Sequence, residues 1–281
     1  MATRREIVLR IASAIEPLYG EAEARQIAEM VVLECGNISR NQLLIEPNEE
    51  LEILDLDRII SELSAWRPVQ YVISREWFDD MALEVGEGVL IPRPETEELV
   101  AWIASQEEPT AHVLDVGTGS GCIAIALRRR LHRGHVWAMD ISSVALEIAR
   151  RNAMRYAPDV EFVEGDALAD FSQLFATKLD VVVSNPPYIP RSDVRLMRPN
   201  VTDYEPQLAL FVDDDDPLKF YRAIARTSRK LLRDEGRLYF EIYEQFAGEM
   251  VDMLIAEGSS DIVVKEDFRQ KPRMICAVKS L

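Results

Sequence analysis

The second half of the chain alternates between short apolar runs rich in β-branched residues and longer segments with helical periodicity. This alternation is typical of parallel strands joined by crossover helices. We therefore expect an α/β fold built on a doubly wound sheet of seven strands. The last two strands are separated by a short loop and should form an antiparallel hairpin at the edge of the sheet. The predicted strands are Val113–Val116, Val136–Asp140, Glu161–Glu164, Asp180–Ser184, Arg237–Ile242, Asp261–Glu266 and Met274–Val278, with helices near 121–131, 143–155, 217–233 and 244–257.

Residues 1–70 have a different pattern, that of helices with short connections. Ile7, Ile11 and Ile15 recur at helical spacing, and glycines at 20 and 36 are typical helix ends. Further helices are predicted near Ser39–Leu44 and from about Asn48 to Ala65, the latter with an apolar stripe of Leu51, Leu54, Ile59 and Leu63. We expect three parts: a helical bundle over 1–70, a β-hairpin linker over 71–91 with strands Glu76–Phe78 and Ala82–Val85, and an α/β domain over 92–281. Pro92 and Pro94 predict that the next helix starts only at Glu95.

Composition limits the possible partners. Asp and Glu total 49 against 32 Lys and Arg, a net charge of −17, which disfavours binding to a phosphate backbone. Three scattered cysteines and three histidines show no metal-ligand spacing, so we expect neither a disulfide framework nor a metal site, and Asp213–Asp216 is interpreted as a solvated loop. The charged N-terminal segment does not resemble a signal peptide, and no long apolar run predicts a membrane helix. We expect a cytoplasmic monomer.

Three predicted strand ends indicate a site for an adenosine-type ligand. DVGTGSG, from Asp115 to Gly121, has the glycines that let a backbone turn tightly and approach a ligand, although such a loop is also a common structural turn. Asp140 ends the second strand, where a carboxylate accepts ribose hydroxyls or caps the following helix. Asp166 and Ala167 follow the third strand, where the adenine ring would lie. The predicted cofactor-binding residues are Gly117, Thr118, Gly119, Ser120, Gly121, Asp140, Asp166, Ala167 and Asn185.

The fourth strand ends in Ser184-Asn185-Pro186-Pro187-Tyr188, at the edge of the sheet where ligands bind. The two prolines have no backbone N–H, so this loop offers acceptors: the Pro186 carbonyl and the Asn185 side-chain oxygen. A planar NH₂ group can donate one hydrogen bond to each, and Tyr188 can stack on it. Two fixed acceptors would aim a poorly nucleophilic amide nitrogen at an activated methyl group, which favours S-adenosylmethionine over a dinucleotide. The predicted catalytic residues are Asn185, Pro186 and Tyr188.

With these motifs, the chain resembles the release-factor glutamine methyltransferases (the HemK/PrmC family). The resemblance spans the helical bundle, Ile91-Pro-Arg-Pro-Glu-Thr-Glu, the glycine loop, Asp140, Asn-Pro-Pro-Tyr at 185–188, Tyr204-Glu-Pro-Gln and the closing strand with Arg273. One difference is Val212-Asp-Asp-Asp-Asp-Pro, where family members usually carry glycines.

The resemblance implies a Rossmann-like seven-stranded methyltransferase sheet and S-adenosyl-L-methionine as cofactor, with S-adenosyl-L-homocysteine as product. It also implies transfer of a methyl group to the glutamine of a Gly-Gly-Gln motif in peptide-chain release factors. The implied substrate-binding residues are Asn185, Pro186, Pro187, Tyr188, Arg93, Glu95 and Thr96, with Arg93–Glu97 near the methionine end of the cofactor. Residues 1–70 would recognise the release factor.

Three alternatives remain open. A ribosomal protein is a possible glutamine-containing substrate, because closely related enzymes act on one. Adenine in a nucleic acid also presents an NH₂ group, but its binding would require a basic groove, and the 16 acidic against 8 basic residues over 1–80 count against one. A non-catalytic binding protein would be expected to have a damaged glycine loop or Asn-Pro-Pro-Tyr motif, and both are intact.

Overall fold

The computed structural model describes residues 2–280, and the chain divides into two compact units. Of the described residues, the first unit contains those up to Arg75 together with Arg198–Tyr204, and the second contains Glu76–Met197 and those from Glu205 onward.

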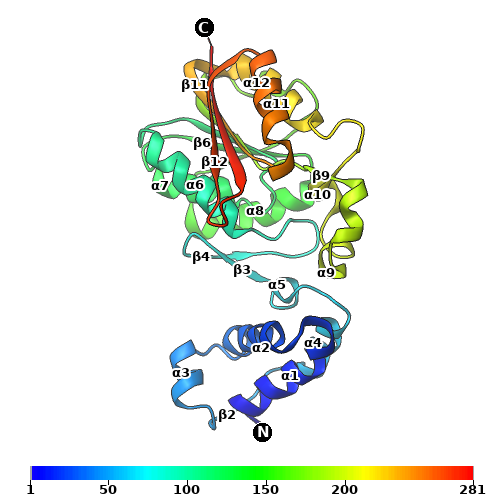
Figure 1. The fold of residues 1–281 in the computed structure, drawn as a ribbon. Coiled ribbons are helices and arrows are strands. Elements are labelled where there is room, and N and C mark those ends of the chain that lie inside the picture. The colour runs from blue at the N-terminus through cyan, green and yellow to red at the C-terminus, as the bar shows by residue number, and fades with distance from the viewer. Residues whose placement is uncertain (1, 281) are drawn as a thin grey trace. The chain divides into compact units, whose positions relative to one another are not determined.

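The first unit is helical (Figure 1). Helix α1 packs against α2, and buried Ile7, Ile11 and Ile15 supply the predicted apolar face of α1. Thr3 caps α1 through a reciprocal capping box with Glu6, which satisfies backbone donors that a helix start leaves free. The helices are α1 (Arg4–Tyr19), α2 (Glu21–Cys35), α3 (Arg40–Ile45), α4 (Leu56–Ser64), α5 (Val69–Val72) and α9 (Pro199–Thr202).

The helix predicted from Asn48 to Ala65 is wrong in its first half. Strand β2 (Glu50–Leu51) pairs antiparallel with β1 (Ala2–Thr3), and the Glu49 and Pro47 carbonyls accept from the backbone of Arg4 and Arg5. These tertiary hydrogen bonds replace the helical ones. Asp55 then adopts a left-handed conformation at φ 55°, so α4 begins only at Leu56. Leu54, predicted to belong to the buried stripe, is 80% exposed.

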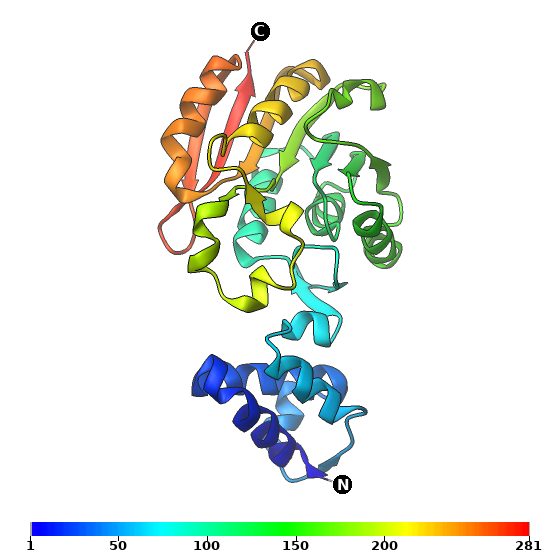
Figure 2. The same cartoon turned by 90° about the vertical axis from the view of Figure 1, so that its right-hand side faces the viewer.

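The second unit is a seven-stranded sheet with helices on both faces (Figure 2). The strand order is β12-β13-β11-β8-β5-β6-β7, with every pair parallel except the two that involve β13. The doubly wound sheet with an antiparallel C-terminal hairpin is therefore confirmed. The strands are β5 (Val113–Val116), β6 (Val136–Asp140), β7 (Glu161–Glu164), β8 (Leu179–Ser184), β11 (Leu232–Glu241), β12 (Ser259–Glu266) and β13 (Pro272–Lys279).

Alternate residues of the central strands enter two separate cores. Val113 and Val181 face α6 (Pro94–Gln106), α7 (Cys122–Arg130) and α8 (Ser143–Tyr156). Leu114 and Val182 face α11 (Lys219–Leu231) and α12 (Ala247–Ala256). Because both faces are covered, these strands carry apolar residues at successive positions rather than only at alternate ones. α6 begins at Pro94, one residue before the predicted Glu95, because proline is tolerated at the first helical position.

The remaining segments of the chain are short, and the first of them, β3 (Arg75–Phe78), begins at the last residue before the second unit. Strand β3 pairs with β4 (Met81–Glu84) before α6. After the sheet strand β8, β9 (Ile189–Pro190) pairs in parallel with β10 (Phe211–Val212), which ties the chain that follows Asn-Pro-Pro-Tyr to a segment more than twenty residues away. The connecting turns are η1 (Phe171–Leu174), η2 (Arg191–Leu196), α10 (Gln207–Leu210) and η3 (Glu244–Phe246).

The acidic loop that differs from the usual family pattern is paired with basic side chains. Asp213 accepts from Lys219 at 2.8 Å, and Asp216 accepts from Arg222 at 3.0 Å. Within residues 2–280, no group of three acidic, histidine or cysteine side chains is arranged to hold a metal ion. In the same part of the chain, no helix combines the length and apolarity required to cross a membrane.

Candidate active site

The glycine loop follows β5, at the centre of the sheet. Gly117, Gly119 and Gly121 have φ values of 75°, 55° and 84°, a region that other residues enter only with strain. The Gly117 and Thr118 amides donate to the Met139 carbonyl at 2.8 and 3.0 Å, so the loop is fastened to the end of the neighbouring strand β6. Space is open where a Cβ atom would stand on Gly117 and Gly119. The loop therefore presents bare backbone to that space.

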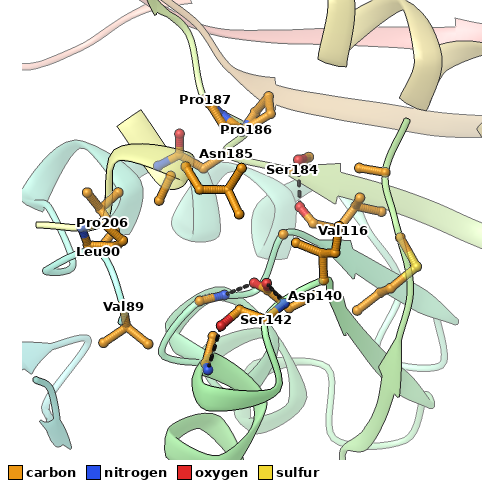
Figure 3. Close-up of a pocket in the computed structure, with 18 of the residues that line it drawn as sticks. Val89, Leu90, Val116, Asp140, Ser142, Ser184, Asn185, Pro186, Pro187 and Pro206 are labelled. Atoms are coloured by element: carbon orange, nitrogen blue, oxygen red, sulfur yellow. Dashed lines mark hydrogen bonds between the residues drawn. The ribbon is translucent and has the colours of Figure 1, made fainter. Parts of the chain in front are cut away.

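Asp140, the last residue of β6, is held by backbone donors. The Gly119 amide donates to Oδ2 and the Ser142 amide to Oδ1, each at 2.9 Å (Figure 3). Burial raises the pKa of this carboxyl, and the two amides oppose that shift. A carboxylate has about four acceptor positions, so each oxygen can still accept from a ligand hydroxyl.

A buried carboxylate lies under the glycine loop. Asp115 is fully buried in β5 and accepts from the Thr118 hydroxyl at 2.6 Å. Burial raises the pKa of Asp115 to about 7. Thr118 and Ser120 are themselves buried, and a Cβ atom on Gly121 would come within 3.1 Å of Ala149 in α8. These three loop residues support the turn from behind.

The Asn185 loop follows β8, the strand beside β5. The Ser184 hydroxyl donates to the Val116 carbonyl at 2.6 Å and thereby fixes the two strand ends together. The Asn185 Nδ2 atom donates to Thr96 Oγ1 at 3.4 Å. Tyr188 lies behind the loop, where its ring stacks on Tyr243 with centroids 6.0 Å apart.

Sequence reasoning missed Glu241, which connects these side chains. Glu241 ends β11, is 1% exposed, and accepts from Thr96 at 2.6 Å and from Tyr188 at 3.0 Å. Burial raises the pKa of its carboxyl, and the two hydroxyl donors lower it. A signal was present, because an acidic residue inside the apolar run Leu238–Ile242, at the carboxyl end of a central strand, is unusual unless it has partners.

Glu205 is a second buried carboxylate that was missed. It is 3% exposed, accepts from the Ile91 amide at 3.1 Å, and forms an ion pair with Arg93. The Ile91–Arg93 segment is thus fixed to the segment that contains Pro206 by one side chain.

The glycine loop, Asp140 and the Asn185 loop surround one cavity of about 490 Å³ (Figure 3). We call Gly117, Gly119 and Asp140 the glycine wall, and Asn185, Pro186 and Pro187 the asparagine wall; all six line the cavity. Asp166 and Ala167 also line it. The other predicted site residues are not among those that line it: Arg93, Glu95, Thr96, Thr118, Ser120, Gly121 and Tyr188.

The rest of the cavity is mainly apolar. Met139, Ile141 and Val144 line it next to Asp140, and Leu90, Leu208 and Phe220 contribute further apolar side chains. A cavity of this size with few polar groups is typical of a small-molecule site, and it lies at the carboxyl ends of strands where the order reverses. The arrangement suits a flat, largely apolar ring with a diol next to Asp140.

Comparison with known proteins agrees with this geometry. Residues 95–198 match the family model described as "Methyltransferase small domain". Among solved structures, a methyltransferase from Pyrococcus furiosus covers 72% of this chain and 90% of its own at a TM-score of 0.54 and 16% identity. The delta-N METTL16 methyltransferase domain gives a TM-score of 0.55 at 16% identity, with 77% of this chain and 96% of that chain covered. These similarities show the fold.

Sequence relatives extend the match to nearly the whole chain. The release factor glutamine methyltransferase of Bacteroides thetaiotaomicron is 38% identical over 277 residues, 96% of this chain and 98% of that protein. The protein of the same name from Flavobacterium psychrophilum is 35% identical over 272 residues, 93% and 94% of the two chains. The one from Streptomyces coelicolor is 32% identical over 98% of this chain and 99% of its own. The chain therefore belongs to the release factor glutamine methyltransferase family and is a methyltransferase.

Proposed function

We propose that this enzyme transfers a methyl group from S-adenosyl-L-methionine to the side-chain amide nitrogen of the glutamine in the Gly-Gly-Gln motif of peptide-chain release factors. The observation that carries the proposal is a single cavity that brings the glycine wall and the asparagine wall together. The first has groups for a nucleoside, and the second has acceptors for an NH₂ group. The names of the relatives support the release factor as substrate.

The residues present fit S-adenosylmethionine. Gly117 and Gly119 leave open the space that a Cβ atom would take, so a ligand can approach their backbone closely. Asp140 keeps free acceptor positions for the two ribose hydroxyls. The apolar lining next to it, including Met139 and Ile141, suits the adenine ring, and Asp166 at the same end suits the exocyclic amine. When bound, the cofactor supplies a methyl group activated by a positively charged sulfur.

The asparagine wall would hold and orient the substrate. Pro186 and Pro187 offer no backbone donors, so an incoming NH₂ group meets acceptors without competition. An amide nitrogen is a weak nucleophile because its lone pair is delocalised, and two hydrogen bonds accepted from it draw electron density onto nitrogen. Fixed alignment of two reactants lowers a barrier by roughly 7–11 kcal/mol. The nitrogen proton becomes acidic only as the new N–C bond forms, so no strong base is required before attack.

We further propose that the helical first unit recognises the release factor, while the second carries out the chemistry. The first unit is stabilised by its own core of buried aliphatic residues, separate from the two cores of the sheet. Several large apolar side chains remain exposed on it, among them Leu44 at 69%, Ile45 at 78% and Leu54 at 80%. Contiguous exposed apolar side chains mark protein-binding surfaces, and Leu44 and Ile45 are neighbours at the end of α3.

A labelling experiment tests the function. In three separate reactions, the full chain and methyl-labelled S-adenosylmethionine are incubated with a purified release factor, a ribosomal protein or duplex DNA. We expect label in the release factor, and none in a release factor whose Gly-Gly-Gln glutamine is replaced by glutamate, which lacks the NH₂ group. Label in another substrate, or label unaffected by that replacement, contradicts the proposal.

A further inference from the structure

The proposed function requires the Asn185 carboxamide to point its oxygen toward the substrate. The sequence of the loop does not fix this orientation. An amide has an acceptor end and a donor end of nearly the same shape. With its oxygen toward the substrate, Asn185 accepts from the glutamine NH₂ group. With its nitrogen there, two donors face each other and the hydrogen bond is lost. Some feature outside the loop must therefore choose between the two orientations.

We propose that Glu241 and Thr96 are a positioning pair that fixes the Asn185 amide with its nitrogen inward and its oxygen free to accept from the substrate. This inference rests on the proposed function, because it gives a reason for that orientation. Neither residue lines the cavity, so both would act through Asn185 rather than on the substrate.

While Glu241 is ionised, these hydrogen bonds have only one consistent direction. An ionised carboxylate can only accept hydrogen bonds, so the Thr96 hydroxyl must donate its single proton to Glu241 Oε2, 2.6 Å away. Thr96 Oγ1 can then only accept a hydrogen bond from Asn185. The Asn185 Nδ2 atom lies 3.4 Å from Thr96 Oγ1 and donates to it. A reversed amide would place its oxygen against those lone pairs, which is repulsive. The carboxylate therefore sets the amide through one intervening hydroxyl.

The carboxylate itself is held in place. Its second oxygen accepts from the Tyr188 hydroxyl at 3.0 Å, and its backbone carbonyl accepts from the Tyr221 hydroxyl at 3.0 Å. Thr96 and Glu241 are 2% and 1% exposed, so water does not compete for these bonds. In the described part of the chain, residues 2–280, the Asn185 carboxamide makes one hydrogen bond, the one from Nδ2, so its oxygen keeps both lone pairs.

Two substitutions at one position separate orientation from packing. Thr96→Val keeps the shape and removes the hydroxyl, and Thr96→Ser restores it. Because loss of one oriented hydrogen bond is worth about tenfold, we expect Thr96→Val to lower kcat/KM for the release factor about tenfold. The dissociation constant for S-adenosylhomocysteine should stay within about threefold, and Thr96→Ser should recover most of the loss. Equal losses in both variants, or no loss in either, overturn the proposal.

The pH profile is a second readout, which a purely structural role would not change. Burial raises the pKa of Glu241, so its protonation takes place at a higher pH than for an exposed glutamate. Once protonated, Glu241 can donate to Thr96. The threonine hydroxyl is then free to donate to the Asn185 oxygen, which reverses the preferred orientation of the Asn185 amide. The groups that face Glu241 are Arg273 of β13, Glu95 of α6, Cys122 of α7, Tyr188 and Tyr221. We expect kcat/KM to fall on the acid side in the native enzyme, and Glu241→Gln to have low activity without that acid limb. The same acid limb in Glu241→Gln counts against the pair.

A third readout does not depend on the substrate. The side-chain NH₂ signals of Asn185 in a ¹⁵N-labelled protein are identified by their absence in Asn185→Ala. We expect one of the two proton signals to move upfield and exchange faster with water in Thr96→Val, and to return in Thr96→Ser. Unchanged signals in Thr96→Val overturn the positioning role even if release factor is methylated. If the signals change but no release factor is labelled, the proposed substrate is wrong and the positioning pair stands.

Discussion

The glycine wall and the asparagine wall are each backed by a threonine hydroxyl that donates to a buried carboxylate at 2.6 Å. On the glycine side, Thr118 and Asp115 are three residues apart in one strand-to-helix turn. On the asparagine side, Thr96 and Glu241 are 145 residues apart, on α6 and β11. The same chemical device is thus built locally in one wall and only by the tertiary fold in the other.

The difference follows from what each wall presents. The glycine wall offers backbone and the Asp140 carboxylate, and both are fixed by nearby groups. Local φ values and the adjacent strand direct the backbone, and the Gly119 and Ser142 amides hold the carboxylate. The asparagine wall offers a side-chain amide, which rotates freely unless distant groups hold it. We therefore expect substitutions in the glycine wall to change cofactor binding, and substitutions in the asparagine wall to change methyl transfer.

The largest effect is expected from Asn185→Ala. Removal of one of two acceptors that align and activate the substrate nitrogen should lower kcat about 1,000-fold, a loss similar to that of a charge-stabilising group in other enzymes. Affinity for S-adenosylhomocysteine, measured by calorimetry, should remain within about tenfold. Near-normal turnover, or an equally large loss of cofactor affinity, would remove the distinction between the two walls.

Asp140→Ala should have the opposite profile. Loss of two hydrogen bonds to a charged group costs about 3 kcal/mol, so the dissociation constant for S-adenosylhomocysteine should rise about 100-fold. At saturating S-adenosylmethionine, kcat should stay within a few-fold. Asp252→Ala, which removes an exposed carboxylate on α12, is the matched control and should leave both values unchanged. A fall in kcat without a change in affinity would contradict the assignment of Asp140 to the nucleoside.

The same distinction explains what the sequence could predict. β5, β6 and β7 have the predicted bounds, because apolar, β-branched runs at regular intervals report strands directly. The glycine loop and Asp140 were also predictable, since their geometry is local. Glu241 and Glu205 were not found, because Glu241 depends on Thr96 and Glu205 on Ile91, each more than 100 residues away in the chain. Residues 48–55 were assigned to a helix for the same reason: the strand pairing with Ala2–Thr3 is invisible to local periodicity.

The two units of the chain permit a third test, with a smaller effect. Replacement of Leu44, Ile45 and Leu54 together by serine removes exposed apolar side chains from the first unit without disturbing its core. If this unit recognises the release factor, KM for that substrate should rise about tenfold while kcat and cofactor affinity stay constant. Met154→Ser, on α8 of the second unit and 75% exposed, is the control. Unchanged KM in the triple variant would show that these side chains do not take part in recognition.

The smallest effect concerns the carboxylate behind the glycine wall. Burial raises the pKa of Asp115 to about 7 from 3.8, so the folded protein holds a proton that the unfolded chain releases between these values. The resulting stability is present in full below pH 3.8 and is lost as the pH rises through about 7. From pH 6 to 8 this amounts to roughly 1.4 kcal/mol, or a fall in Tm of about 3 °C. Asp115→Asn cannot titrate at this position. Between pH 6 and 8 its Tm, followed by circular dichroism, should therefore fall by about 3 °C less than the Tm of the native protein. Parallel Tm curves for the two proteins would show that Asp115 does not change its protonation in this window, and would remove the expected difference in charge between the carboxyl groups behind the two walls.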